Sequence, residues 1–203
     1  MKKYVLVYKK IIAIISVLLI VACALPVVVS SGYSVLSADD FSHGMQIGVF
    51  NVSLYEYLKA SFVFVKYIYM TWQGTYSAML MQALLSPVNN GGMSQLSIVM
   101  LCNSSLFFVS LIFMISTVAY KINHENLYIK LFILASICFM ITGYQSYTEI
   151  FYWFSGAVSY TFPLSFLMIS LSTFLLYNRS RKESYYVISL VSGIIAMGRL
   201  SEN

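Results

Sequence analysis

Charged residues are scarce in this sequence. Asp, Glu, Lys and Arg make up 9% of its 203 residues, whereas 60% are hydrophobic, and the mean hydropathy is +0.80. A soluble domain carries about 25% charged residues, so the composition argues against a soluble domain and is typical of an integral membrane protein. The formal charge of +5 comes from short basic clusters beside apolar segments. Basic clusters at the ends of apolar segments are typical of a membrane protein, whereas a nucleic-acid-binding protein carries a continuous basic stripe. Nucleic acid is therefore not an expected partner.

Cysteine is scarce as well. Cys23, Cys102 and Cys138 lie in apolar segments and share no motif spacing. An odd number of cysteines without such spacing argues against a metal or redox site. We expect all three to be small apolar packing residues.

The first long apolar run, residues 11–29, is expected to be an uncleaved membrane-spanning helix. The residues up to Cys23 resemble a lipoprotein cleavage box, and Ala22-Cys23-Ala24 resembles a signal peptidase site. The run nevertheless continues past these positions without turning polar, and its length is near the about 20 residues needed to span a bilayer.

Four further apolar segments predict an all-α integral membrane protein with about five transmembrane helices in a single domain, residues 1–203. These segments are residues 96–120, 127–143, 157–177 and 184–200, of which the second and fourth are short for a span. With the N-terminus inside, nine of the twelve basic residues lie inside, as the positive-inside rule requires. The inner nine are Lys2, Lys3, Lys9, Lys10, Lys121, Lys130, Arg179, Arg181 and Lys182, and the outer three are Lys59, Lys66 and Arg199.

The first extracytoplasmic loop, residues 32–95, is expected to hold amphipathic helices at the membrane interface. Residues 60–85 are largely apolar, but a polar stripe at helical spacing runs along this stretch. The stripe consists of Glu56, Lys59, Lys66 and Gln73. Residues 72–76 should break the helix. The alternative, that residues 60–85 form a sixth span, would place five basic residues outside and reverse the charge bias.

Two adjacent carboxylates, Asp39 and Asp40, lie at the start of this loop. Aspartate is unfavourable inside a bilayer, so a pair at its edge must face water, a cation or a polar substrate. We therefore expect a reaction site on the outer face of the membrane. The alternative is a helix-capping box formed by Ser37 and Asp40, although Gly44 and Gly48 count against a helix here.

His43 lies one helical turn from the two aspartates. A metal site is one interpretation of this spacing, and an ordinary interfacial histidine is the one we expect.

The second outer segment, residues 144–160, is dense in aromatic residues and carries Glu149. An aromatic belt at the headgroup level accounts for most of these rings. Trp153, followed by Gly156 and Tyr160, is different, because a tight turn beside stacking surfaces suits a sugar ring or a prenyl chain.

The predicted fifth span runs directly into a polar cluster, residues 198–203, and we expect the chain to be an N-terminal fragment that lacks later spans. Within the cluster, Arg199 and Glu202 have helical spacing. They form either a plain surface pair or part of the site.

The assembled pattern resembles the polytopic membrane glycosyltransferases of the GT-C type, and more narrowly an uncharacterised bacterial family of that type found with surface-polysaccharide genes. The matching features are Asp39-Asp40, Trp72-x-Gly74, Glu149-x-x-Tyr152-Trp153-x-x-Gly156-x-x-x-Tyr160 and Ser201-Glu202-Asn203. In that family a basic residue commonly follows the Trp-x-Gly. Here Thr75 occupies the position, which leaves Lys66 or Arg199 for contact with a phosphate.

The resemblance implies transfer of a sugar from a polyprenyl-phosphate donor to a glycan or lipid-linked acceptor, on the outer face of the bacterial cytoplasmic membrane. Inverting displacement needs a base for the acceptor hydroxyl and a cation near the leaving phosphate. Asp39 or Asp40 is the candidate base, and the other positions the acceptor or a divalent cation such as Mg or Mn. The candidate substrate-binding residues are His43, Lys66, Trp72, Glu149, Trp153, Tyr160, Arg199 and Glu202.

Two other classes of function stay open. A transporter or flippase of lipid-linked sugars would carry ionisable groups and broken helices near the middle of its spans. A non-catalytic membrane partner subunit would need no cluster of outer carboxylates.

Overall fold

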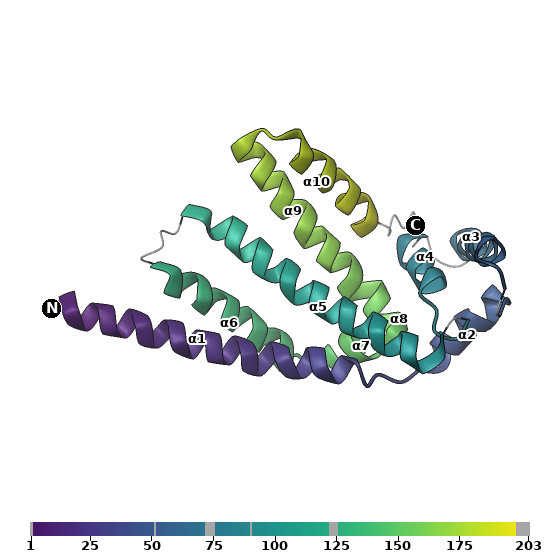
Figure 1. The fold of residues 1–203 in the computed structure, drawn as a ribbon, viewed down its shortest axis with the longest axis horizontal. Helices are drawn as coiled ribbons and strands as arrows, with labels where there is room; N and C mark the ends of the chain where they lie inside the picture. The colour runs from purple at the N-terminus through teal and green to yellow at the C-terminus, as the bar shows by residue number, and fades with distance from the viewer. Residues whose placement is uncertain (1, 51, 72–75, 90, 122–125, 198–203) are drawn as a thin grey trace.

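The computed structural model describes residues 2–50, 52–71, 76–89, 91–121 and 126–197, and every element in these ranges is helical (Figure 1). The α-helices are α1 (Lys2–Ser31), α2 (Ala38–Ile47), α3 (Leu54–Thr71), α4 (Tyr76–Leu84), α5 (Gly92–Val118), α6 (Leu127–Gly143), α7 (Tyr147–Tyr152), α8 (Phe154–Gly156), α9 (Phe162–Ser180) and α10 (Glu183–Ala196). A 3-10 turn, η1 (Ala119–Lys121), follows α5, and a π-helical segment, η3 (Ala157–Thr161), joins α8 to α9. The predicted all-α class is confirmed.

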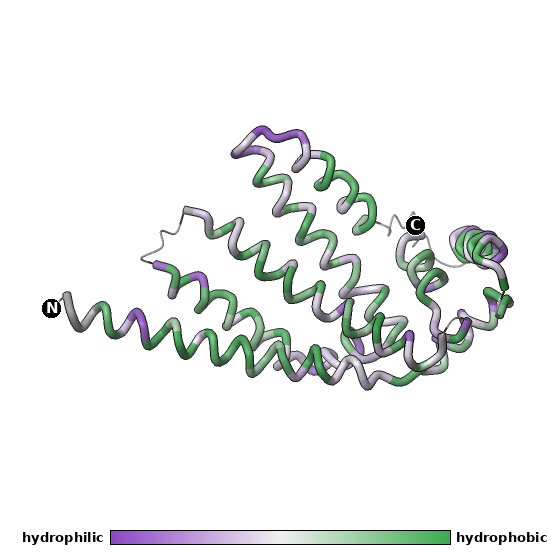
Figure 2. Tube along the Cα trace, in the orientation of Figure 1, coloured by the Kyte–Doolittle hydropathy of each residue, from purple (hydrophilic) through white to green (hydrophobic). Residues whose placement is uncertain are grey.

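Among the residues that the structure describes, three helices are long and apolar enough to cross a membrane, which indicates a membrane protein. They are Leu6–Ser31, Gly92–Val118 and Phe154–Ser180. At 1.5 Å per residue each is about 40 Å long, more than the hydrocarbon core of about 30 Å. Their apolar middles are visible in Figure 2. The apolar helices α6 and α10 have 17 and 14 residues, so the count of five spans stays a prediction.

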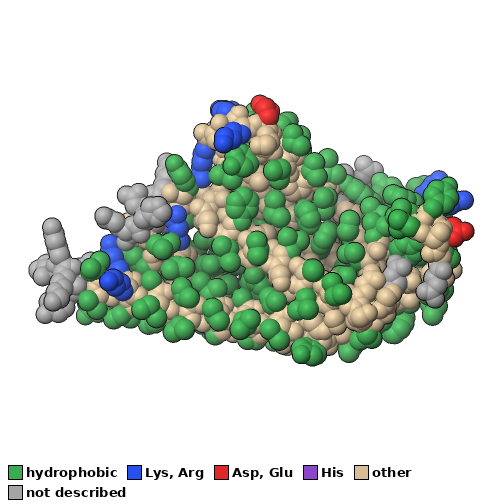
Figure 3. All heavy atoms as spheres, viewed as in Figure 1, with side chains coloured by type: hydrophobic (Ala, Val, Ile, Leu, Met, Phe, Trp, Pro, Cys, Tyr) green, Lys and Arg blue, Asp and Glu red, His purple; other side chains and the backbone are tan. Residues whose placement is uncertain are grey.

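Most of the Lys and Arg side chains in view lie toward one end of the helix bundle, and a smaller group lies at the other end, over α3 (Figure 3). The start of α1, the C-terminal end of α5, the start of α6 and the α9–α10 connection lie at the first end, and α2, α3 and α4 lie at the other (Figure 1). The Arg179 guanidinium lies 4.4 Å from the centre of the Tyr120 ring. Lys9 Nζ donates a hydrogen bond of 3.3 Å to Asn126 Oδ1. These contacts join helix ends that are far apart in the sequence.

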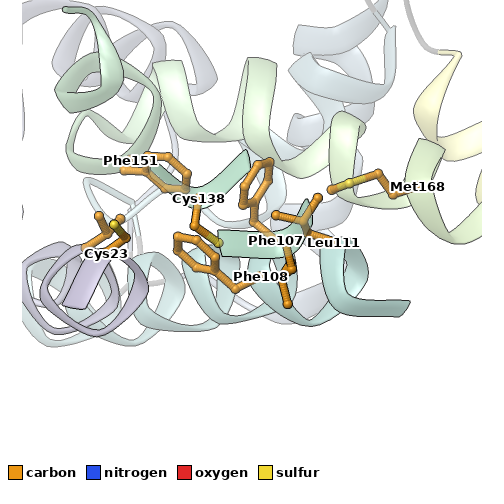
Figure 4. Close-up of a cluster of buried hydrophobic side chains, with 9 residues drawn as sticks. Cys23, Phe107, Phe108, Leu111, Cys138, Phe151 and Met168 are labelled. Carbon is orange, nitrogen blue, oxygen red and sulfur yellow. The ribbon is translucent and has the colours of Figure 1, made fainter. Parts of the chain in front are cut away.

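The bundle packs around a cluster rich in aromatic rings and sulfur (Figure 4). It contains Cys23 and Val27 of α1, Phe107, Phe108 and Leu111 of α5, Leu134 and Cys138 of α6, Phe151 of α7 and Met168 of α9. Phe151 stacks on Phe108 at 5.9 Å between ring centroids and meets Phe107 edge-on at 5.2 Å. Two of the three cysteines are therefore packing residues, as expected, whereas Cys102 is exposed on α5.

The opposite end of the bundle contains α2, α3 and α4, the helices of the segment that was expected to be the first loop. The buried face of α3 consists of Tyr57, Ser61, Phe64 and Ile68, at spacings of three and four. Glu56, Lys59 and Lys66 are exposed, as the predicted polar stripe requires. Figure 1 shows α3 nearly end-on, whereas α1, α5, α6 and α9 run across the picture. Because α3 runs crosswise and is not among the span-length apolar helices, an interfacial helix is favoured over a sixth span.

Helix α2 forms although its sequence contains glycine. Gly48 follows the helix with a φ of 73°, and its N–H donates to the carbonyl oxygen of Gly44. Gly48 therefore ends the helix as a left-handed C-cap. Gly44 allows the α4–α5 connection to approach closely, because a Cβ there would lie 2.6 Å from Val88 Cβ. The helix therefore forms with the two glycines that were expected to weaken it, one just beyond its last residue and one at a close contact.

Candidate functional site around helix α2

Asp40, in the first turn of α2, faces α8 and is only 1% exposed. Its Oδ2 accepts hydrogen bonds from Ser37 N at 2.8 Å and from Ser37 Oγ at 3.3 Å. This is the capping box that the sequence offered as an alternative. Its Oδ1 accepts from Ser155 N at 2.9 Å and from Ser155 Oγ at 2.5 Å. Asp40 therefore caps α2 and also ties its first turn to a segment 115 residues away.

Two further buried side chains, Gln82 and Asn89, fix the positions of α2 and α4. Gln82 Nε2 of α4 donates to Ser155 Oγ at 3.0 Å. Asn89 Nδ2 donates to the carbonyl oxygens of Gly44 and Val49, both at 2.9 Å. The start of α2 is thus held through Asp40 and its end through Asn89, so the exposed residues between them have a fixed position.

Asp39 and His43 lie in different environments on α2. Asp39 is exposed, whereas His43 is buried with its ring edge-on to Phe64, at 5.8 Å between centroids. Burial lowers the His43 pKa from its ordinary value of 6.5, against weaker opposite effects of Asp39 and Asp40. The imidazole is therefore neutral at neutral pH. Of the two acids, Asp39 is the one whose side chain is open to a ligand from outside the fold.

The described residues do not fit the divalent cation that the resemblance implies. They contain no group of three or more His, Cys, Asp or Glu side chains that could hold a metal ion. Each Asp40 oxygen already accepts two hydrogen bonds, which uses the roughly four acceptor positions of a carboxylate. Asp39 alone is a poor site for Mg or Mn, which need several oxygen ligands.

Residues 144–160 are mostly helical, with a bend at Trp153, and Gly156 has helical backbone angles rather than those of a tight turn. A Cβ on Gly156 would lie 2.3 Å from the carbonyl oxygen of Glu149 and 2.9 Å from the Trp153 ring, so only glycine fits. Trp153 is half-buried, and its Nε1 has no hydrogen-bond partner within the described part of the chain. The side chains of Glu149 and Tyr160 are exposed. Phe154 is fully buried, so it belongs to the core rather than to an aromatic belt.

The structure brings together only some of the predicted site residues. Helix α2 carries three of them, and one of the three, Asp40, is hydrogen-bonded to Ser155 in the segment that carries Trp153. Lys66 is exposed on α3 and forms no ion pair with any described residue. Trp72, Arg199 and Glu202 lie outside the described residues.

Sequence reasoning missed Ser155, Gln82 and Asn89. None of the three is charged or belongs to a motif with a known chemistry. The only local signal is a polar residue at a buried helical position, as for Gln82 in the apolar stretch of α4.

No protein-family model, curated protein or solved structure matches this chain. The likeness to GT-C glycosyltransferases therefore depends on the sequence motifs alone, and the function has to be argued from the site.

Proposed function

We propose that this protein is a membrane glycosyltransferase that moves a sugar from a polyprenyl-phosphate donor to a cell-surface glycan or lipid-linked acceptor. The observation that carries the proposal is the difference between the two adjacent acids of α2. Asp40 is buried and bonded on both oxygens, whereas Asp39 is exposed on the helix that Asp40 holds in place. Asp39 is the base, and Asp40 is a positioning residue.

The chemistry follows from these positions. The acceptor hydroxyl oxygen attacks the anomeric carbon of the donor sugar, and the bond from that carbon to the phosphate oxygen breaks. The bonding electrons leave with the polyprenyl phosphate, and Asp39 takes the proton of the acceptor hydroxyl. A general base works only when it is held within hydrogen-bond reach of that proton. The bonds at both ends of α2 supply this rigidity.

The arrangement of the helix ends supports a site on the outer face of the bacterial cytoplasmic membrane. The basic ends lie opposite α2, α3 and α4 (Figures 1 and 3). The positive-inside preference places the basic ends in the cytoplasm. In this topology α6 and α10 are short spans, and α2 lies outside at the headgroup level. A polyprenyl phosphate diffusing in the bilayer presents its phosphate at that depth.

A transporter of lipid-linked sugars is the second candidate, and the π-helical segment η3 favours it. Asn103 Nδ2 of α5 donates to Thr161 Oγ1 at 2.6 Å and to the carbonyl oxygen of Ala157 at 3.4 Å. Interrupted helices beside polar groups are typical of transporters. Yet Gly92–Val118 contains no Asp, Glu, Lys, Arg or His, and of these residue types Phe154–Ser180 contains only Arg179, near its end. The glycosyltransferase is therefore the better supported function.

The proposal is tested by Asp39→Asn and Asp40→Asn, each made alone in cells. We expect Asp39→Asn to reach normal membrane levels and to abolish the sugar decoration of the surface polysaccharide. Asp40→Asn should lower the amount of folded protein. Normal polysaccharide in the Asp39→Asn cells would defeat the proposal, and it is the result that a non-catalytic partner subunit would give.

A further inference from the structure

A groove of about 660 Å³ lies between the C-terminal end of α2 and one side of α3. Its floor is apolar and includes Ile47 and Phe64, and its rim is polar and includes Gln46, Glu56, Lys59 and Tyr67. We propose that this groove binds the acceptor glycan of the transfer reaction. The assignment of the glycan as acceptor rests on the proposed function.

The rim of the groove carries a negatively charged hydrogen-bond acceptor, Glu56, and a positively charged donor, Lys59. Glu56 Oε2 accepts from Ser53 N at 3.2 Å and from Ser53 Oγ at 2.9 Å, which leaves Oε1 for a ligand. Lys59 lies one helical turn further along α3, is exposed and forms no ion pair with a described residue. Because the two charges cancel, the rim suits a neutral ligand rich in hydroxyl groups. An anionic lipid headgroup would meet the Glu56 carboxylate.

The length and lining of the groove suit a chain of sugars. Its α3 residues extend from Glu56 to Tyr67, which is about 16 Å along a helix. Tyr67 is 58% exposed at one end of this stretch. An exposed aromatic ring can pack against the C–H face of a sugar ring while its hydroxyl bonds a neighbouring oxygen, because the side chain has an apolar body and a polar tip.

Helix α2 connects the groove to the proposed base. Gln46 follows Asp39 by seven residues, or nearly two turns, so the two side chains share one face of α2. Ser42 lies between them, and all three are exposed. A glycan in the groove that continues along this polar face reaches Asp39 after about 10 Å.

Glycan binding by the purified full chain in lipid nanodiscs, without donor, tests the assignment. The probes are oligosaccharides released from the surface polysaccharide of the cells that express the protein. We expect wild type to bind and Tyr67→Ala to weaken binding about tenfold or more. Tyr69→Ala is the matched control, because Tyr69 is 50% exposed on the same helix but outside the groove. It should bind like wild type, and both variants should keep the wild-type thermal midpoint.

Three results would overturn the assignment. They are no binding by wild type, equal binding by the two tyrosine variants, and displacement of the oligosaccharide when phosphatidylglycerol replaces phosphatidylcholine in the discs. The last result would identify a lipid headgroup site. Binding is measured without donor, so it does not depend on catalysis. Normal transfer by Asp39→Asn would therefore refute the proposed glycosyltransferase function without contradicting glycan binding in the groove. If Tyr67→Ala bound the oligosaccharide as tightly as wild type does, the assignment of the groove as the glycan site would be refuted, even if Asp39→Asn abolished transfer.

Discussion

Replacing Asp40 by asparagine should destabilise the protein far more than the same change at Asp39. The Asp40 carboxylate accepts four hydrogen bonds, two from Ser37 and two from Ser155. Asparagine keeps one acceptor oxygen and replaces the other by an NH₂ group. Whichever way the amide is turned, the NH₂ faces a backbone N–H, either that of Ser37 or that of Ser155. One buried donor then loses its acceptor, and the remaining bonds lose the assistance of the charge.

The size of the effect follows from these bonds. A hydrogen bond to a charged group contributes about 1.5–3 kcal/mol, and an unsatisfied buried donor costs about 1–3 kcal/mol. We therefore expect Asp40→Asn to lower the free energy of unfolding by about 3 kcal/mol. For a chain of 203 residues this corresponds to a fall of about 6–12 °C in thermal midpoint. Asp39 is exposed in the first turn of α2, so Asp39→Asn removes only a helix-dipole contribution of less than about 1 kcal/mol.

The assay is the fraction of monodisperse protein that survives heating in detergent, measured for wild type and both variants. Equal shifts for Asp39→Asn and Asp40→Asn would refute the assignment of Asp40 as the residue that holds α2 in place. A normal midpoint for Asp40→Asn, together with lost transfer, would move the role of base to Asp40.

Acidification should lower the thermal midpoint of wild type, because the unfolded chain takes up a proton that burial withholds from His43. The folded pKa is below the ordinary value of 6.5, so stability is full above that pH and falls as pH drops toward the folded value. His43→Gln should flatten this dependence between about pH 7.5 and about pH 5.5, and an unchanged slope would exclude His43 as its source. Gly156→Ala should cost about 2 kcal/mol or more, because its Cβ would lie 2.3 Å from the carbonyl oxygen of Glu149. Gly143→Ala, whose Cβ meets nothing within 4 Å, should leave the midpoint unchanged or higher; equal midpoints for the two variants would contradict the packing. Asn103→Leu should keep both folding and transfer. The change loses the hydrogen bonds that Asn103 Nδ2 donates, but it also removes the buried Oδ1 that has no partner among the described residues, and the two effects offset each other. Loss of sugar movement across the bilayer in this variant would favour the transporter.

Most of the helical frame could be predicted because long apolar runs bounded by polar residues leave few alternatives to a helix in a membrane protein. Helix α6 has the predicted bounds, Leu127–Gly143. The apolar helix that ends at Ser180 begins at Phe154 rather than at the predicted residue 157. Its first residues looked like part of an aromatic belt, and only the folded core shows that Phe154 is buried.

The roles of the two aspartates could be predicted only in part. The spacing of Ser37 and Asp40 correctly offered a capping box. Adjacent residues on a helix point about 100° apart, so the two acids face different surroundings. Which one is buried depends on the contact of α2 with α8. The partner, Ser155, lies 115 residues away and is one serine among many, so no local pattern could identify it.

The measurement that tests the central claim most directly is the initial rate of sugar transfer to the surface glycan in right-side-out membrane vesicles. The vesicles carry either wild type or Asp39→Asn, at matched protein level and with matched thermal midpoints. If Asp39 is the base, the rate should fall by about 100-fold or more, the usual contribution of a positioned general base. A variant rate within about twofold of wild type would contradict the account.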